Sequence, residues 1–241
     1  MVFIEQGSAI LLMVTMSIIA IVLVIKYIEN IARFKKKIDF VLFAYAIASM
    51  IRHYIIWTNR GQFYNYIPFQ VCYFTMFIYM YYYISGNRKV LPFLHIFGFL
   101  GIGALIAPGH SFDFGSIVSY IFMIDHIILA VLPFYIIIAH KYYPEYKRLT
   151  ILPYTFTPLF LISILLSNWI NNNQFLGASG ASVQTWIMEA NYFFLIRNPI
   201  TQYAINPWIV GVIQIICMVL FGALATWLGQ IIYTKIYKEQ L

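Results

Sequence analysis

The chain has 241 residues, of which 62% are hydrophobic and only 10% are charged, with a formal net charge of +7. An average soluble domain is nearer half apolar and a quarter charged, so this composition excludes a soluble globular protein and a disordered chain. Two cysteines, Cys72 and Cys217, are too few for a disulfide framework or a cysteine-rich zinc site.

Seven apolar runs are candidates for helices that cross a bilayer, because a hydrocarbon core about 30 Å thick needs about 20 apolar residues. In chain order they are Ser8–Tyr27, Asp39–Trp57, Tyr64–Ile84, Val90–Pro108, Ile117–Ala139, Thr150–Ile170 and Trp208–Thr234. The first run lacks a basic start and a small-residue cleavage site, so we expect it to remain as a helix. The runs fill residues 1–241 and predict one all-α, polytopic membrane domain, a bundle of six to seven transmembrane helices.

Basic residues give this bundle an orientation. Twelve of the 15 lysines and arginines follow the first, third, fifth and seventh runs: Lys26, Arg33, Lys35, Lys36, Lys37, Arg88, Lys89, Lys141, Lys147, Arg148, Lys235 and Lys238. The positive-inside rule then predicts a cell-membrane protein with its N-terminus outside and its C-terminus in the cytoplasm. The cluster Arg33-Phe-Lys-Lys-Lys37 would also touch anionic headgroups. Nucleic acid is not an expected partner, because it needs a basic groove rather than short loops.

One connection is much longer than the others. Residues 171–207 are predicted to lie outside, and long loops in compact bundles are often lids or binding segments. The apolar stretches Trp186–Met188 and Tyr192–Ile196 argue against full disorder, so we expect a short interfacial or re-entrant helix there. A flexible surface loop is the alternative.

Polar groups inside the bilayer are costly and are functional candidates by default. Three predicted helices carry such groups roughly 8–14 Å below the outer surface, at a 1.5 Å rise per residue: Arg52 and His53, Gln70 and Cys72, Asp125 and His126. The inner half is expected to have little comparable beyond His95. A buried Arg and a buried Asp need partners, so Arg52 and Asp125 are expected to pair. Either these groups surround one cavity, or they merely satisfy one another between helices.

Cys72 is the candidate nucleophile, because a thiol reacts as the thiolate and is helped by a nearby histidine or cation. His126 is the candidate base, and Asp125 points about 100° away from it on the helix, so it is not expected to orient the ring. Cys72 as a small apolar core residue, or in a disulfide with Cys217, remains open. No phosphate-binding loop, nucleophile elbow or metal-ligand spacing is present, so no cofactor or metal is expected. Close helix packing is expected at Gly98, Gly101 and Gly103.

Three segments, in order and on matching predicted helices, carry a resemblance to a known family. Ile67-Pro-Phe-Gln-Val-Cys-Tyr73 resembles the Leu-Pro-Leu-His-Leu-Cys-Asp segment of the YwaF-like bacterial membrane proteins. Asp125-His126 falls where that family has a histidine in an apolar helix, and Asn191-Tyr-Phe-Phe-Leu-Ile-Arg-Asn-Pro199 looks like its Asn-Tyr-x-x-Leu-x-x-x-Pro segment. The sequence departs from the family at Gln70, which often is His there, and at Tyr73, which often is Asp.

The resemblance implies a membrane-embedded activity. A eukaryotic relative of the family is an acyltransferase that makes ether phospholipids and is thought to use a Cys and a His in the membrane; by resemblance these are Cys72 and His126 here. The leading hypothesis is therefore thiol-dependent lipid acyl transfer or hydrolysis, with membrane lipids as partners and Arg52 or His53 stabilising charge or holding a phosphate. The remaining candidates for substrate binding are Gln70, Asp125, Asn191 and Tyr192. The alternative is non-enzymatic: a transport component or a small-molecule-binding subunit that uses the same polar layer.

Overall fold

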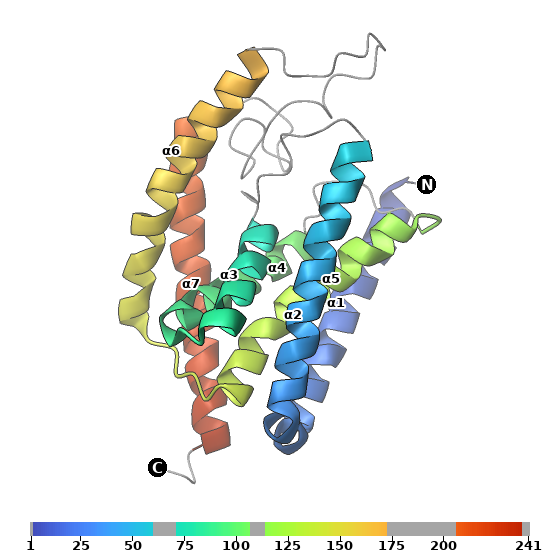
Figure 1. The fold of residues 1–241 in the computed structure, drawn as a ribbon, viewed down its shortest axis with the longest axis vertical. Coiled ribbons are helices and arrows are strands. Elements are labelled where there is room, and N and C mark those ends of the chain that lie inside the picture. The colour runs from blue at the N-terminus through green and yellow to red at the C-terminus, as the bar shows by residue number, and fades with distance from the viewer. Residues whose placement is uncertain (1, 60–70, 107–113, 173–205, 238–241) are drawn as a thin grey trace.

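The computed structural model describes residues 2–59, 71–106, 114–172 and 206–237 (Figure 1). These residues form seven α-helices, with two short 3-10 turns named η2 (Arg88–Val90) and η3 (Tyr146–Thr150), and no strand. The helices are α1 Val2–Lys26, α2 Ile28–Asn59, α3 Val71–Ser85, α4 Leu91–Ile106, α5 Ile117–Ala139, α6 Ile151–Asn172 and α7 Pro207–Tyr237. The predicted all-α fold is confirmed.

Five helices of the described chain are long and apolar enough, by length and composition, to cross a membrane. Their candidate spans are Gly7–Lys26, Asn30–Ile55, Ile117–Ala139, Tyr146–Leu166 and Trp208–Tyr237. The described parts of α3 and α4 are shorter, at 15 and 16 residues. The chain is thus a multi-pass helical membrane protein, and its N- and C-terminal orientation stays a prediction.

The connection expected before Asp39 is instead helical, because α2 begins at Ile28, directly after a one-residue bend. The backbone N–H of Tyr27 donates to the carbonyl of Leu23, and that of Ile31 donates to the carbonyl of Tyr27, both at 2.9 Å. Hydrogen bonding therefore continues through the bend, and the basic segment that follows is rich in good helix formers. The result is a 32-residue helix whose first turns carry the basic cluster.

Helices α4 and α5 approach closely at glycines. A Cβ atom on Gly98 would lie 2.6 Å from Cδ of Pro133 and 2.8 Å from the carbonyl oxygen of Leu129, and one on Gly101 would lie 2.9 Å from Cβ of Leu129. Backbones come this near only where no side chain intervenes. The close-packing prediction is confirmed at Gly98 and Gly101, whereas the surroundings of Gly103 lie outside the description.

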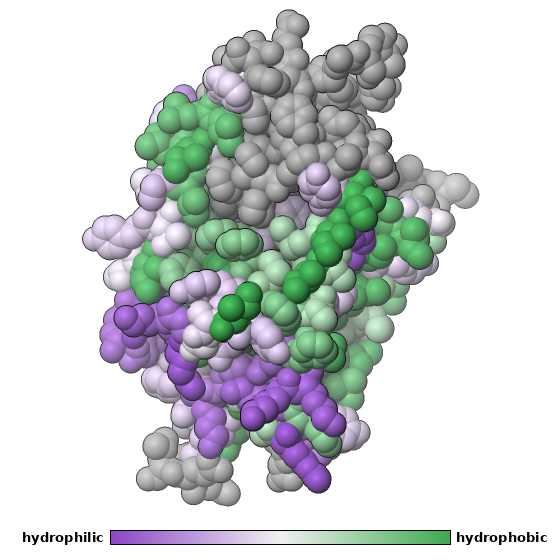
Figure 2. Space-filling model, in the orientation of Figure 1, coloured by the Kyte–Doolittle hydropathy of each residue, from purple (hydrophilic) through white to green (hydrophobic). Residues whose placement is uncertain are grey.

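The hydrophilic surface gathers at one end of the molecule. Figure 2 shows it over the lower part of this view, the end at which Figure 1 places the α1–α2 bend and the C-terminus. Contacts tie the chain together there: Arg88 Nη2 donates to the carbonyl of His140 at 2.7 Å, and the Lys141 ammonium lies 5.6 Å from the ring centre of Tyr237. We call this the basic end of the bundle.

Candidate functional site

Helix α2 presents a polar face toward α5. Tyr45, Ser49 and Arg52 follow one another at intervals of four and three residues, which puts them on one side of a helix. His53 lies at the edge of the same face. Each of these side chains offers a hydrogen-bond donor, and a buried carboxylate on a neighbouring helix needs such donors.

That carboxylate is Asp125 of α5, and its side chain is only 6% exposed. Arg52 Nη2 donates to Oδ2 at 2.5 Å, Ser49 Oγ donates to Oδ1 at 3.4 Å, and the Tyr45 hydroxyl also donates to Oδ1. Arg52 Nη2 lies 3.0 Å from Ser49 Oγ as well. Both oxygens of the buried charge are therefore satisfied, and the expected pairing of Arg52 with Asp125 is present.

Helix α3 joins this arrangement through His53. The Nε2 atom of His53 lies 3.7 Å from Asp125 Oδ2 and 3.4 Å from Arg52 Nη2. The Nδ1 atom lies 3.2 Å from the hydroxyl of Tyr73, whose ring meets the His53 ring edge-on at 4.4 Å. Tyr73, a departure from the family segment, thus supplies a polar partner of its own. We call Tyr45, Ser49, Arg52, His53, Tyr73 and Asp125 the Asp125 cluster.

Cys72 precedes Tyr73 on α3 and is partly buried against an apolar group made by Ala46, Met76 and Leu129. Leu129 follows Asp125 by one helical turn, so this apolar group reaches the part of α5 that carries Asp125 and His126. Both cysteines are free, and Cys217 is exposed on α7, so a Cys72–Cys217 disulfide is wrong as an alternative.

His126 is buried, and its ring is oriented by its own helix. Its Nδ1 lies 2.8 Å from the carbonyl oxygen of Phe122, and the two rings are 4.0 Å apart. A carbonyl accepts only, so Nδ1 carries the proton, and in the neutral ring Nε2 holds a lone pair. As expected, Asp125 does not orient this ring. No hydrogen bond between Cys72 and His126 is among the contacts described for the two residues.

Arg52 has one group that the Asp125 cluster does not use. Its Nε is buried and has no hydrogen-bond partner among the described residues. The side chain as a whole is 24% exposed, so Arg52 is not fully enclosed by the described residues. A buried N–H without an acceptor is costly and is a natural contact for an oxygen of a bound anion or carbonyl.

The sequence reasoning missed a second polar cluster, at the basic end. Asp39 Oδ1 accepts hydrogen bonds from Tyr135 (2.7 Å), Tyr79 (3.1 Å) and His140 Nε2 (3.0 Å), and the Tyr82 hydroxyl lies 2.6 Å from His140 Nδ1. We call these five residues the Asp39 cluster.

The expectation that the inner half holds little beyond His95 is therefore wrong. The cause is a boundary error: hydropathy puts Asp39 at the start of the run Asp39–Trp57 and leaves His140 one residue past the run Ile117–Ala139, so neither stands out as a polar group inside a helix. His95 itself is buried and lies 3.2 Å from the carbonyl oxygen of Ala225 through Nε2, a packing role.

Three of the candidate site residues, Gln70, Asn191 and Tyr192, lie outside the described residues, as does most of the long 171–207 connection. Over the described ranges, no group of three His, Cys, Asp or Glu side chains is placed to hold a metal ion.

An all-helical bundle with five helices long and apolar enough to cross a membrane is a polytopic membrane protein, and in this one a charged cluster lies between α2, α3 and α5. The chain belongs to the TMEM164 family, whose model matches residues 3–225. No curated protein and no solved structure is similar to it. The narrower YwaF-like assignment stays an expectation from the sequence.

Proposed function

We propose that this protein transfers or hydrolyses acyl chains of membrane lipids, with Cys72 as the nucleophile and His126 as the proton acceptor. The observation that carries the proposal is the position of Cys72. It packs against the apolar group of Ala46, Met76 and Leu129, and Leu129 lies one turn from Asp125 and His126 on α5. A thiol, a histidine whose Nε2 holds a lone pair and a fixed cation are the three groups that acyl transfer needs.

The chemistry runs in two steps. His126 Nε2 takes the proton of the Cys72 thiol, and the sulfur attacks the carbonyl carbon of a lipid ester. The ester C–O bond breaks, the lysolipid leaves as an alcohol with the proton from His126, and the acyl chain remains on Cys72 as a thioester. A second lipid hydroxyl, or water, then attacks the thioester and regenerates the thiol. The Phe122 carbonyl supports this role because it fixes Nδ1 as the protonated nitrogen.

Arg52 is suited to hold the substrate. Its terminal nitrogen is engaged by Asp125 and Ser49, while its Nε has no partner among the described residues. A phosphate oxygen or a developing oxyanion would accept from this N–H and satisfy it. Asp125 is then a positioning residue, because it fixes the guanidinium without touching the lipid.

The same unsatisfied Nε favours one other function: binding of a small anionic molecule without chemistry, as in a transport or binding subunit. The two functions differ in what they ask of Cys72. Acyl transfer requires the sulfur itself, whereas a binding site next to Arg52 tolerates serine at position 72, which keeps the approximate size and shape of the side chain.

A thiol-directed acyl probe in native membranes tests the proposal. The parent is Cys217→Ser, which removes the exposed second thiol. We expect labelling of Cys72 in this parent, none in its Cys72→Ser derivative, and a fall of about 10²-fold or more in its rate with His126→Ala, the size of effect typical of a lost general base. Size-exclusion chromatography in detergent checks that each variant folds. Equal labelling rates with and without His126 would remove it from the reaction, and an unreactive Cys72 in a folded parent would leave the binding function.

A further inference from the structure

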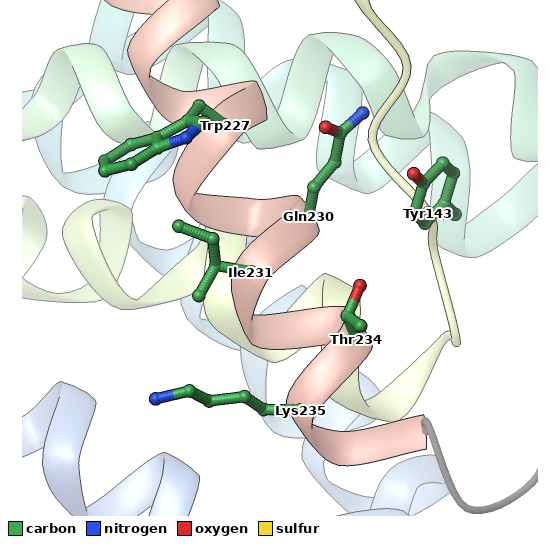
Figure 3. A pocket seen from close by; sticks show the side chains of 6 residues that line it. All are labelled: Tyr143, Trp227, Gln230, Ile231, Thr234 and Lys235. Atoms are coloured by element: carbon green, nitrogen blue, oxygen red, sulfur yellow. The ribbon is translucent and has the colours of Figure 1, made fainter.

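A shallow groove lies near the basic end of α7 and shares no residue with either polar cluster (Figure 3). Its volume is about 440 Å³. The side chains that line it are Tyr143 from the α5–α6 connection and, from α7, Trp227, Gln230, Ile231, Thr234 and Lys235. The proposed acyl chemistry uses none of them.

The wall of the groove is firmly built. A Cβ atom on Gly229 would lie 2.7 Å from Cγ of Pro144, so α7 touches the α5–α6 connection directly there. Gln230 Nε2 donates to the carbonyl of Pro144 at 2.9 Å, and the ring of Tyr143 meets that of Tyr233 edge-on at 5.2 Å. These contacts hold Tyr143 beside α7 and give the groove a fixed shape.

The chemistry of the groove changes along the helix axis. Trp227, Ile231 and Lys235 follow one another at four-residue intervals and project on one side of α7 in Figure 3, while Thr234 points toward Tyr143. The stripe passes from apolar to cationic over eight residues, about 12 Å at 1.5 Å per residue. An apolar track that ends in a cation matches an acyl chain that ends in a phosphate.

Charge decides which lipid fits. Lys235 forms no ion pair with any described residue, and a second lysine of the basic end, Lys141, has its ammonium over the ring of Tyr237. The nearby carboxylate of Glu145 is taken up by Lys147 at 2.9 Å and Arg148 at 3.3 Å, which also lower the pKa of Glu145 by hydrogen bonding and charge. The groove thus offers net positive charge to a headgroup.

We propose that this groove binds one anionic glycerophospholipid from the leaflet at the basic end. Its headgroup phosphate pairs with the Lys235 ammonium, and one acyl chain runs along Ile231 to Trp227 on the same side of α7 (Figure 3). A zwitterionic lipid carries a choline or ethanolamine cation that Lys235 repels.

Quenching of Trp227 by brominated lipids tests this. The protein is reconstituted in phosphatidylcholine vesicles with either brominated phosphatidylglycerol or brominated phosphatidylcholine, and the Trp227 signal is obtained as the difference from Trp227→Phe. We expect about a fivefold preference for the anionic quencher, the effect of one lysine near an anionic lipid. Lys235→Gln should remove the preference. Lys89→Gln, an exposed lysine at the same end but on η2, is the matched control and should keep it.

Equal quenching by the two lipids in the wild type overturns the proposal, and so does an equal loss in Lys235→Gln and Lys89→Gln, which would mean a diffuse field rather than a site. If Lys235→Gln does not reconstitute, Lys235→Met takes its place, because it removes the charge and keeps the aliphatic part of the side chain. Retention of the full preference in that variant would also overturn the site. The outcome is independent of Cys72 labelling.

Discussion

Removing Arg52 and removing Asp125 should lower the free energy of unfolding by different amounts, although the two residues form one ion pair. In Arg52→Met, the Asp125 carboxylate stays behind at 6% exposure with Tyr45 and Ser49 as donors and His53 Nε2 3.7 Å away. Removing one partner of a buried pair costs about 3–5 kcal/mol. In Asp125→Leu, the Arg52 side chain is 24% exposed, keeps Ser49 and can turn toward the surface, so the loss should be about 2 kcal/mol, that of a charged hydrogen bond.

The double variant should be milder than Arg52→Met alone, because no unpaired charge is left in the bundle and the two new side chains pack together. Apolar replacements of a buried pair are often close to neutral, which gives a coupling energy of at least about 2 kcal/mol. The assay is reversible unfolding in mixed micelles with increasing sodium dodecyl sulfate. Ser49→Ala, which removes one neutral donor, serves as the scale and should cost about 1 kcal/mol. Strict additivity of the two single effects would refute the reasoning, and so would a larger loss for Asp125→Leu than for Arg52→Met.

Three further predictions concern the packing of α4 on α5, the Asp39 cluster and the orientation in the membrane. Gly98→Ala should lower the free energy of unfolding by about 1–3 kcal/mol through overpacking against α5, whereas Gly7→Ala, with nothing within 4 Å of the new Cβ, should be neutral or stabilising in the same micelle titration. Asp39→Leu leaves two tyrosine hydroxyls and a histidine without their acceptor and should cost about 3 kcal/mol in that titration; an unchanged midpoint would contradict the described network. For topology, cysteines introduced at Gly115 and at Lys147 should be labelled by an impermeant maleimide in intact cells only at position 115, and the reverse pattern would overturn the orientation.

The fold was largely readable from the sequence because the bilayer imposes length and composition on every spanning helix. The runs at Ile117–Ala139 and Trp208–Thr234 correspond closely to α5 and α7. The error at the start of α2 has a physical origin. Hydropathy detects only the apolar part of a helix. It does not detect a helix that continues beyond the membrane, where basic residues are good helix formers.

The Asp125 cluster was only partly predictable. Charged residues inside an apolar run stand out, so Arg52 and Asp125 were found from their cost alone. Tyr45 and Ser49 were missed, although their spacing from Arg52 is the signal that reveals them: a donor at each turn of one face. The partner of His126 could not be found in this way, because a backbone carbonyl has no sequence signature, and the link from Tyr73 to His53 depends on how α3 packs against α2.

The Asp39 cluster could not be predicted from the sequence either. Tyrosines near a helix end are expected in interfacial belts, so Tyr79 and Tyr82 carried no information about an acceptor. Only the packing of α2, α3 and α5 turns the Tyr79 hydroxyl toward the Asp39 carboxylate and the Tyr82 hydroxyl toward His140.

The most direct test of the proposed chemistry is the mass of the intact protein after incubation in phospholipid vesicles. An acyl-enzyme adds the mass of one fatty acyl chain on Cys72, and neutral hydroxylamine removes it, since thioesters are cleaved under conditions that spare oxygen esters. The account predicts this adduct in the wild type and in Cys217→Ser, its absence in Cys72→Ser, and its slow formation in His126→Ala. A folded wild-type protein that never carries a hydroxylamine-labile acyl chain on Cys72, however long it is held with lipid, would contradict it.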